Sequence, residues 1–370
     1  MSFEAFYRPC PNFPERFISP KELSDFLQSN LTDSISLLGH STEGRPIYKF
    51  QKGHGKVRVV AWSQMHGNES NATHALLDML YTLEELPQLE EDLFSRITLD
   101  FVVMLNPDGS ERWSRLNSNG IDLNRDFHKM ESEEIKILKS LVLEGNYHYA
   151  LNLHEQRTIF TTDGVHPATL SFLSPSEDAE RGITKGRKKL MAVVAHLNRM
   201  LSPLLPSRIA RYTDEFYPNS TGDNFTKLGI PTLLFEGGHT EEDYFRKDTR
   251  KFYTVALYYA LELMAELKGS IEGFEEYFDL PENKESHYDI IYRNVELNTK
   301  FPCVLDIAVQ LKEVKDPEKR EIEWEKVVAA VGDLKDKKGW KEIDCTSFRF
   351  VSKTLYPKLD EIVDFEFVEK

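Results

Sequence analysis

The sequence predicts an α/β protein: a mixed, mostly parallel twisted sheet with helices on both faces, followed by a small β-rich domain. Three observations favour this fold class. Short apolar segments of strand length alternate with amphipathic segments of helix length over residues 57–267, as they do in βαβ units. Polar residues of the kinds used in catalysis follow the ends of these strand-like segments. From about Gly273 onward the alternation gives way to strand-like segments.

The first half of the alternating region predicts two strands and two helices. VRVVAW (57–62) is a β-branched apolar run, typical of a buried strand, and an apolar-periodic helix follows at about residues 71–86. ITLDFVVML (97–105) predicts the second strand, and NPDG (106–109) predicts the turn that ends it. The next helix is expected at about residues 131–143.

The second half repeats this order. YALNL (149–153) predicts a third strand that stops at His154, and a helix is expected at about residues 184–201. TLLFE (232–236) predicts a fourth strand, and a long helix is expected at about residues 241–267. Because the carboxyl ends of parallel strands meet at one edge of the sheet, we expect a binding site there.

Two further regions flank the alternating one. The first 30 residues are rich in proline and aromatic residues and predict an arm that lies on the domain, so residues 1–272 are expected to form one domain with its arm. Residues 273–370 are expected to form the β-rich domain, with a short helix at about 321–331 and a solvated loop at 335–341. Its strands are predicted at residues 289–297, 302–314, 347–351 and 361–368.

Composition and charge limit the expected location and partners. The formal net charge of −15 repels phosphate backbones, so no nucleic-acid partner is expected. The three cysteines are widely spread, which fits a reducing compartment. We find no secretory signal and no apolar run of about 20 residues, so a cytoplasmic protein without a membrane partner is expected. The basic stretch KGRKK (185–189) is interpreted as a solvated helix face.

Acidic and imidazole side chains follow four of the predicted strands. Because these strands share one edge of the sheet, we expect the residues to form one site. Zinc catalysis needs three nitrogen or oxygen ligands and an open position for water, and residues of these types can supply them. The residues are His66 and Glu69, then Asp108, then His154, and finally Glu236.

Each of these residues also has a structural explanation when it is taken alone. The tetrad H-x-x-E at residues 66–69 also occurs by chance in surface loops that precede helices. His154 fits a histidine at the edge of a core. Glu236 fits an ion pair at a strand end, because an unpaired buried carboxylate is costly.

Five short motifs, taken in order, resemble the M14 family of zinc carboxypeptidases over about residues 37–265. LGHSTEGRPIYKF (38–50) is similar to the opening strands of that family, whereas residues 273–370 resemble no family that we can name. The motifs are HGNE (66–69), NPDG (106–109), RLNSNGIDLNRDF (115–127), NLH (152–154) and FEGG (235–238).

The resemblance assigns roles at a metal centre. It implies that His66, Glu69 and His154 hold one zinc ion. It implies that Asp122 orients His66, a contact that fixes the tautomer and raises the basicity of the ligand. It also implies that Glu236 is the general base.

The resemblance further assigns residues that act on the substrate. Arg115 matches the arginine that polarises the scissile carbonyl and stabilises its oxyanion. Asn124 and Arg125 match the pair that grips the terminal carboxylate of the substrate, for which a planar guanidinium is suited. Tyr217 resembles the mobile tyrosine that closes over bound substrate, a role for which Tyr212 is also a candidate.

The implied reaction is hydrolysis of a C-terminal amide or peptide bond by metal-activated water, in a peptide or peptide-like substrate with a free C-terminal carboxylate. Ordinary peptides and cell-wall peptides both fit, and Asp223 either favours a basic terminal residue or is structural. Two alternatives stay open: an N-acyl amino acid deacylase of the aspartoacylase or succinylglutamate desuccinylase type, and a catalytically silent binding module. NPDG, together with the long segment that ends in Asn124 and Arg125, favours the peptidase.

Overall fold

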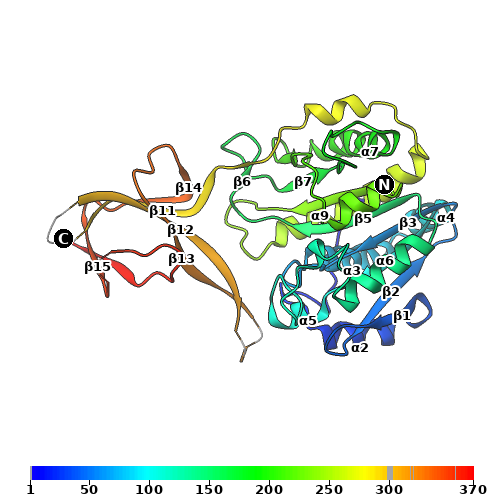
Figure 1. Ribbon diagram of the computed structural model, residues 1–370, viewed down its shortest axis with the longest axis horizontal. Helices are drawn as coiled ribbons and strands as arrows, with labels where there is room; N and C mark the ends of the chain where they lie inside the picture. Colours follow the sequence, from blue (N-terminus) through cyan, green and yellow to red (C-terminus); the bar gives the residue numbers. More distant parts are fainter. Residues whose placement is uncertain (1, 298–302, 317, 320, 355) are drawn as a thin grey trace. The chain divides into compact units, whose positions relative to one another are not determined.

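The computed structural model describes residues 2–297, 303–316, 318–319, 321–354 and 356–370 (Figure 1). The chain divides into two compact units, of which the first comprises Met1–Gln156 and Ala168–Asn283 and the second Arg157–Pro167 and Lys284–Lys370. This division falls after Asn283 rather than after residue 272, because the 3-10 helix η3 (Phe274–Asp279) packs on α7 (Lys185–Leu201) of the first unit.

A sheet of eight strands runs through the described part of the first unit, in the order β1-β2-β4-β3-β5-β9-β7-β8. The central strands β4, β3, β5 and β9 are parallel, whereas β2 pairs with β4 and β7 pairs with β9 in antiparallel fashion. The strands span Ile35–His40 (β1), Pro46–Lys52 (β2), Val57–Trp62 (β3), Ile97–Val103 (β4), Tyr149–Glu155 (β5), Leu170–Leu173 (β7), Ile209–Arg211 (β8) and Thr232–Gly237 (β9).

Helices cover both faces of this sheet, and the side chains of β3 show how. Val59 and Ala61 point into a core that includes residues of α3 and α9, whereas Val60 and Trp62 point into a second core that includes residues of α6. Because both faces of the strand are buried, all of these positions are apolar, which is the pattern that the sequence shows. The predicted fold class is confirmed.

The described α-helices of the first unit include five that the sequence did not predict, namely α1, α2, α4, α5 and α8. Helix α5 grows out of the predicted NPDG turn, because the Asn106 side chain caps it by accepting a hydrogen bond from the Gly109 amide at 2.8 Å. The α-helices span Phe3–Phe6 (α1), Pro20–Asn30 (α2), Asn71–Glu84 (α3), Pro87–Arg96 (α4), Pro107–Arg112 (α5), Glu133–Glu144 (α6), Lys185–Leu201 (α7), Thr221–Lys227 (α8) and Lys247–Leu267 (α9); the 3-10 helices η1 and η2 span Thr32–Ser34 and Leu123–Arg125.

The second unit is built from strands, as predicted. Four of them form one sheet in the order β13-β12-β11-β14, and two short pairs, β10 with β6 and β15 with β16, complete its described part. Its strands span Phe160–Thr161 (β6), Lys284–Glu285 (β10), His287–Leu297 (β11), Cys303–Lys315 (β12), Ile322–Gly332 (β13), Lys338–Asp344 (β14), Phe348–Ser352 (β15) and Phe365–Glu369 (β16). Pro302, the first residue of one predicted strand, lies outside the described residues.

Two predictions in this unit are wrong. The segment predicted as a helix at residues 321–331 forms β13, which pairs with β12 along its whole length. Its glutamates and lysines suit a helix surface, but the long-range ladder with β12 outweighs that local preference. The loop predicted at residues 335–341 becomes strand β14 from Lys338 on, because it pairs in parallel with β11.

The basic stretch 185–189 is also more than a solvated face. Within it Arg187 is fully buried, and its guanidinium lies 2.7 Å from a carboxylate oxygen of Asp214. The solvated interpretation is therefore wrong for this arginine.

Within the part of the chain that the structure describes, no helix is both long enough and apolar enough to cross a membrane.

Candidate metal centre

The first part of the site lies where β3 leads into α3. The backbone amide of Glu69 donates a hydrogen bond to the carbonyl oxygen of His66 at 3.1 Å, so both side chains leave one tight loop. A Cβ atom on Gly67 would lie 2.0 Å from the carbonyl carbon of Gly109, which makes glycine necessary at this position. The side chains of His66 and Glu69 are both buried.

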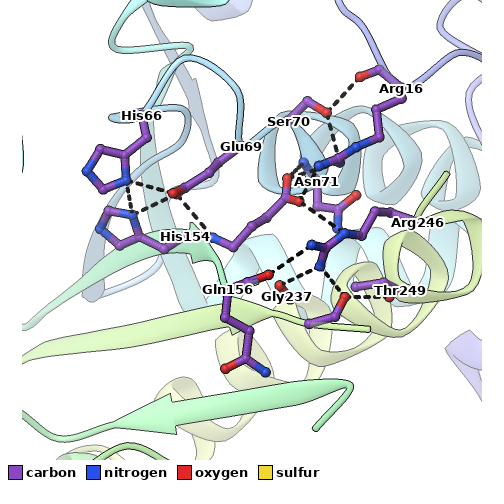
Figure 2. A network of polar contacts seen from close by, with 12 residues as sticks. Arg16, His66, Glu69, Ser70, Asn71, His154, Gln156, Gly237, Arg246 and Thr249 are labelled. Atoms are coloured by element: carbon purple, nitrogen blue, oxygen red, sulfur yellow. Dashed lines mark hydrogen bonds and ion pairs between the residues drawn. The ribbon is translucent and has the colours of Figure 1, made fainter. Parts of the chain in front are cut away.

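Strand β5 brings a third side chain, that of His154, to this loop. The Nδ1 atom of His66 lies 2.8 Å from Oε1 of Glu69, and the Nδ1 atom of His154 lies 2.9 Å from Oε2 of the same carboxylate (Figure 2). The two Nδ1 atoms are 3.1 Å apart. One ligand atom from each of the three residues therefore lies within 4.8 Å of the other two, a spacing at which they could hold one metal ion.

Strand pairing places Glu236 beside His154. The two residues are in register on the parallel strands β5 and β9, so their side chains project from the same face of the sheet. The Oε2 atom of Glu236 is buried and has no hydrogen-bond partner among the described residues. We call His66, Glu69, His154 and Glu236 the metal-site cluster.

The acids of the cluster have very different proton affinities. Burial raises the pKa of Glu236, and the negative charge of Glu69 raises it further, to well above its usual range. Burial also raises the pKa of Glu69, but the two imidazoles beside it have the larger combined effect and lower it. The cluster thus combines a carboxylate that stays ionised with one that binds a proton readily.

Asp122 and Arg115 lie next to the cluster. The Oδ1 atom of Asp122 lies 3.1 Å from Nε2 of His66, on the side of the ring that faces away from Glu69. Nη2 of Arg115 lies 3.0 Å from Oδ2 of Asp122, and Nη1 lies 3.5 Å from Oε1 of Glu69. Asp122 is therefore placed to fix the orientation of the His66 ring, and the half-exposed Arg115 extends a positive charge over the site.

The 3-10 helix η2 holds Asn124 and Arg125 close to this point. Its first turn is capped by Asp122, whose Oδ1 atom accepts a hydrogen bond from the Asn124 amide at 2.9 Å. The Asn124 side chain accepts a hydrogen bond from the Thr221 amide at 3.1 Å, which orients it. The exposed guanidinium of Arg125 lies 5.7 Å from the centre of the Tyr217 ring. The structure thus brings Tyr217 together with Arg125.

Tyr217 is 44% exposed, so its ring has room to move. Its backbone amide donates a hydrogen bond to Asp223 at 2.8 Å. Asp223 is buried, and burial raises its pKa to about 6. This contact gives Asp223 a part in holding the Tyr217 segment in place.

Asp108 does not join the cluster, so the prediction of one site is wrong for this residue. It is buried and binds groups of the β1–β2 turn instead: its carboxylate accepts hydrogen bonds from the Ser41 hydroxyl at 2.7 Å, the Glu43 amide at 2.9 Å and Arg45 at 2.7 Å. Helix α5 begins at Pro107, and it turns the side chain of Asp108 toward that loop.

A buried ion-pair network next to the cluster was not predicted from the sequence: it surrounds the carboxylate of Glu155, and Figure 2 labels Arg16, Asn71 and Arg246 of this network. The carboxylate of Glu155 lies 2.8 Å from Nη2 of Arg16 and accepts a hydrogen bond from the Asn71 amide at 2.6 Å. Its backbone amide donates to Oε2 of Glu69 at 3.1 Å. Arg246 lies 3.9 Å from the same carboxylate and donates to the Gln156 carbonyl. The only indication of this network in the sequence is the acidic residue that directly follows His154.

The cluster fits a zinc ion by its chemistry. Two imidazoles and one carboxylate are the ligand set of many catalytic zinc sites, and they leave one position open. The contact between His66 and Asp122 supplies the carboxylate partner that a ligating imidazole usually has. Because imidazole suits zinc better than it suits magnesium or calcium, the ligand types favour zinc over these ions.

The first comparison with known proteins concerns the sequence. Residues 25–152 match the family model of zinc carboxypeptidases, Peptidase_M14. Among curated protein sequences, none matches the chain at a significant level.

Solved carboxypeptidase structures are similar to this one in fold. The metallo-carboxypeptidase of Burkholderia cenocepacia has a TM-score of 0.53 at 19% identity, with 68% of this chain and 71% of that chain covered. The carboxypeptidase A of Helicoverpa armigera has a TM-score of 0.53 at 14% identity, with 68% and 74% covered. The metallo-carboxypeptidase of Pseudomonas aeruginosa, solved in complex with (2-guanidinoethylmercapto)succinic acid, has a TM-score of 0.50 at 15% identity, with 71% of each chain covered.

At such identities these structures speak for the fold alone, and the sequence match is to the zinc carboxypeptidase model over residues 25–152. Together they confirm the resemblance to the M14 family that the motifs indicated: this part of the sequence matches the family model, and the fold is similar to that of solved metallo-carboxypeptidases.

Proposed function

We propose that the protein is a zinc-dependent carboxypeptidase, which hydrolyses the last peptide bond of a substrate with a free C-terminal carboxylate. The observation that carries this proposal is the convergence of His66, Glu69 and His154 within 4.8 Å, with Glu236 in register beside His154. In this proposal the three converging residues hold one zinc ion. The family match over residues 25–152 supports the same reaction class.

Zinc, when bound, supplies Lewis-acid chemistry that polarises a carbonyl group and makes water acidic enough to attack at neutral pH. Glu236 accepts a proton from the attacking water and returns it to the leaving amine. Its unpartnered Oε2 atom is free to bind that water, and its raised pKa suits a group that both takes up and releases a proton. Arg115 stabilises the negative charge that develops on the carbonyl oxygen.

Arg125, the cation of η2, would account for a preference for substrates with a free terminal carboxylate. Arg125 is exposed and can bind a carboxylate with two parallel hydrogen bonds, and the side chain of Asn124 is held in place by Thr221. Tyr217 covers Arg125 from one side. The ligand of the Pseudomonas aeruginosa enzyme, a substituted succinic acid, supports an organic carboxylate as the group that such a site takes.

The test is a panel of three substrates offered to zinc-loaded protein, with products followed by mass spectrometry. The panel holds a short peptide, the same peptide with a C-terminal amide, and an N-acetyl amino acid. We expect release of the terminal residue from the free peptide and little from the amide, because the amide lacks the charge that Arg125 binds.

Two results would contradict the proposal. Preferred cleavage of the N-acetyl amino acid would make the protein a deacylase, and no turnover of any substrate would make it a binding module. Glu236→Gln is the control, since it should keep the metal ligands and lose turnover.

A further inference from the structure

A cavity of about 460 Å³ opens at the amino ends of β3 and β5, within the first unit. Its walls carry basic side chains and, among the described residues, no acidic one, although the whole chain has a formal net charge of −15. The basic lining residues are Lys56, Arg96, His148, Lys189 and Lys268. We call this the basic cavity.

Three of these five basic residues have no carboxylate partner among the described residues. Arg96 is paired with Asp92 and lies 3.3 Å from Glu262. In contrast, Lys56, Lys189 and Lys268 make no ion pair within the described part of the chain. Positive charges gathered around one cavity repel each other, and an anion between them would relieve that repulsion.

The floor of the cavity offers neutral hydrogen-bond donors as well. The Nδ1 atom of His148 accepts a hydrogen bond from the Arg58 amide at 3.1 Å, so the neutral ring carries its proton on Nε2 and can donate there. Tyr149 is 2% exposed, and its buried hydroxyl has no partner of hydrogen-bond geometry among the described residues. The backbone amide of Gly269 lies near this hydroxyl. A buried polar group is rarely left unpaired, and a ligand that reached this hydroxyl would satisfy it.

Space for that ligand depends on Gly269. Its φ of +83° favours glycine, and a Cβ atom there would lie 3.3 Å from Cε of Lys189 and 3.6 Å from its Nζ. The absence of a side chain thus leaves the Lys189 ammonium group room beside the cavity.

A second explanation for the basic residues is compensation of helix dipoles. Arg96 is the last residue of α4 and Lys268 caps the C-terminus of α9, where a positive side chain is stabilising. This explanation does not extend to Lys56, which precedes β3, or to Lys189, which lies in the first half of α7. It also does not account for the Tyr149 hydroxyl, for which the described residues provide no partner of hydrogen-bond geometry.

We propose that the basic cavity binds a small organic anion, a carboxylate or phosphate monoester with an apolar body. The volume falls in the range of small-molecule sites, and the side chain of Val57 and the ring of Tyr149 provide apolar wall. Tyr149 and His154 lie on the same strand five positions apart, about 16 Å along an extended chain. The cavity is therefore separate from the metal-site cluster, and binding there does not depend on the function proposed above.

The experiment is calorimetric titration of the full chain with phenyl phosphate at low ionic strength, with phenylacetate and inorganic phosphate as further arms. Because Arg125 at the metal centre can also bind an anion, matched variants assign the binding. Lys189→Glu reverses a charge inside the cavity, and Lys185→Glu makes the same change on the exposed first turn of α7. We expect Lys189→Glu to weaken phenyl phosphate binding about tenfold or more and Lys185→Glu to change it less than twofold.

The comparison among the three anions tests whether the cavity prefers a ligand with an apolar body. Phenyl phosphate or phenylacetate should bind more tightly than inorganic phosphate, and equal affinity would overturn this part of the proposal. No binding of either organic anion, or equal weakening by both lysine variants, would overturn the site itself. Should Lys189→Glu not fold, Tyr149→Phe replaces it: loss of the hydroxyl should weaken binding several-fold, and unchanged binding would contradict the proposal.

Discussion

The two ends of the central parallel strands carry opposite chemistry. At the carboxyl end, acids and imidazoles of the metal-site cluster crowd around one point, whereas at the amino end cations surround the basic cavity. Strand β5 links the two, because Tyr149 at its start lines the cavity and His154 near its end belongs to the cluster.

Part of this difference follows the direction of the backbone dipoles. Helix α3 begins at the carboxyl end, where a helix N-terminus has a partial positive charge, and α4 and α9 end at the amino end, where helix C-termini have a partial negative charge. Acids at one end, and Arg96 and Lys268 at the other, therefore compensate these partial charges, whereas Lys56 and Lys189 do not lie at a helix C-terminus. In this account the same strands carry a proposed metal site at one end and a proposed anion site at the other. Substitutions at one end should therefore leave binding at the other end unchanged.

The largest expected effect concerns the carboxyl end. Glu236→Gln keeps the shape of the side chain and removes the proton acceptor, so we expect turnover to fall by about 10²- to 10⁴-fold while the zinc content is unchanged. Steady-state rates and metal analysis of the same samples check this. Full activity in the variant would rule out Glu236 as the general base.

Substitution in the ion-pair network around Glu155 should also have a large effect, in this case on the free energy of unfolding. Arg16→Ala leaves the Glu155 carboxylate, whose side chain is 3% exposed, without its closest cation, and we expect a loss of about 3–5 kcal/mol in the free energy of unfolding. Denaturant unfolding measures it. Arg8→Ala is the matched control on the same arm: its pair with Glu85 is about half exposed, so the loss should stay below about 1 kcal/mol. Similar losses in both variants would contradict a role for burial.

Asp223 is a further buried acid at the carboxyl end of the strands, and its raised pKa should make the stability of the protein depend on pH. Its pKa is raised from 3.8 to about 6 in the folded protein, so between pH 4 and 6 the folded state binds more protons than the unfolded state. The carboxyl therefore lowers stability as pH rises through this window. We expect Asp223→Asn to gain about 2–3 kcal/mol relative to wild type at pH 7 and almost none at pH 4. A difference that does not depend on pH would mean that the raised pKa is wrong.

The alternating region could be read from the sequence because its strands are buried on both faces. Strand β3 occupies residues 57–62 as predicted, and the other central strands begin at the predicted residues. In the second unit the strands are partly exposed, and β13 has a composition that suits either state. Its structure depends on pairing with β12, a contact between distant residues that no local pattern shows.

The candidate site likewise contains residues that could be placed from the sequence and residues that could not. Residues near the ends of strands, such as His66 and His154, could be placed together because the sheet topology brings strand ends together. Asp108 also follows a strand but starts a helix that turns its side chain away, which the turn motif did not indicate. The partners of Glu155 come from the N-terminal arm and from the segment before α9, so no short motif contains them.

The most direct test of the account is a zinc titration of metal-free protein, in which release of the C-terminal residue from a peptide is followed as zinc is added. We predict that activity rises to a plateau at one zinc ion per chain and that His154→Ala needs far more zinc to show any activity. Full activity in chelator-treated protein, or a plateau only at two ions per chain, would contradict a single zinc held by His66, Glu69 and His154.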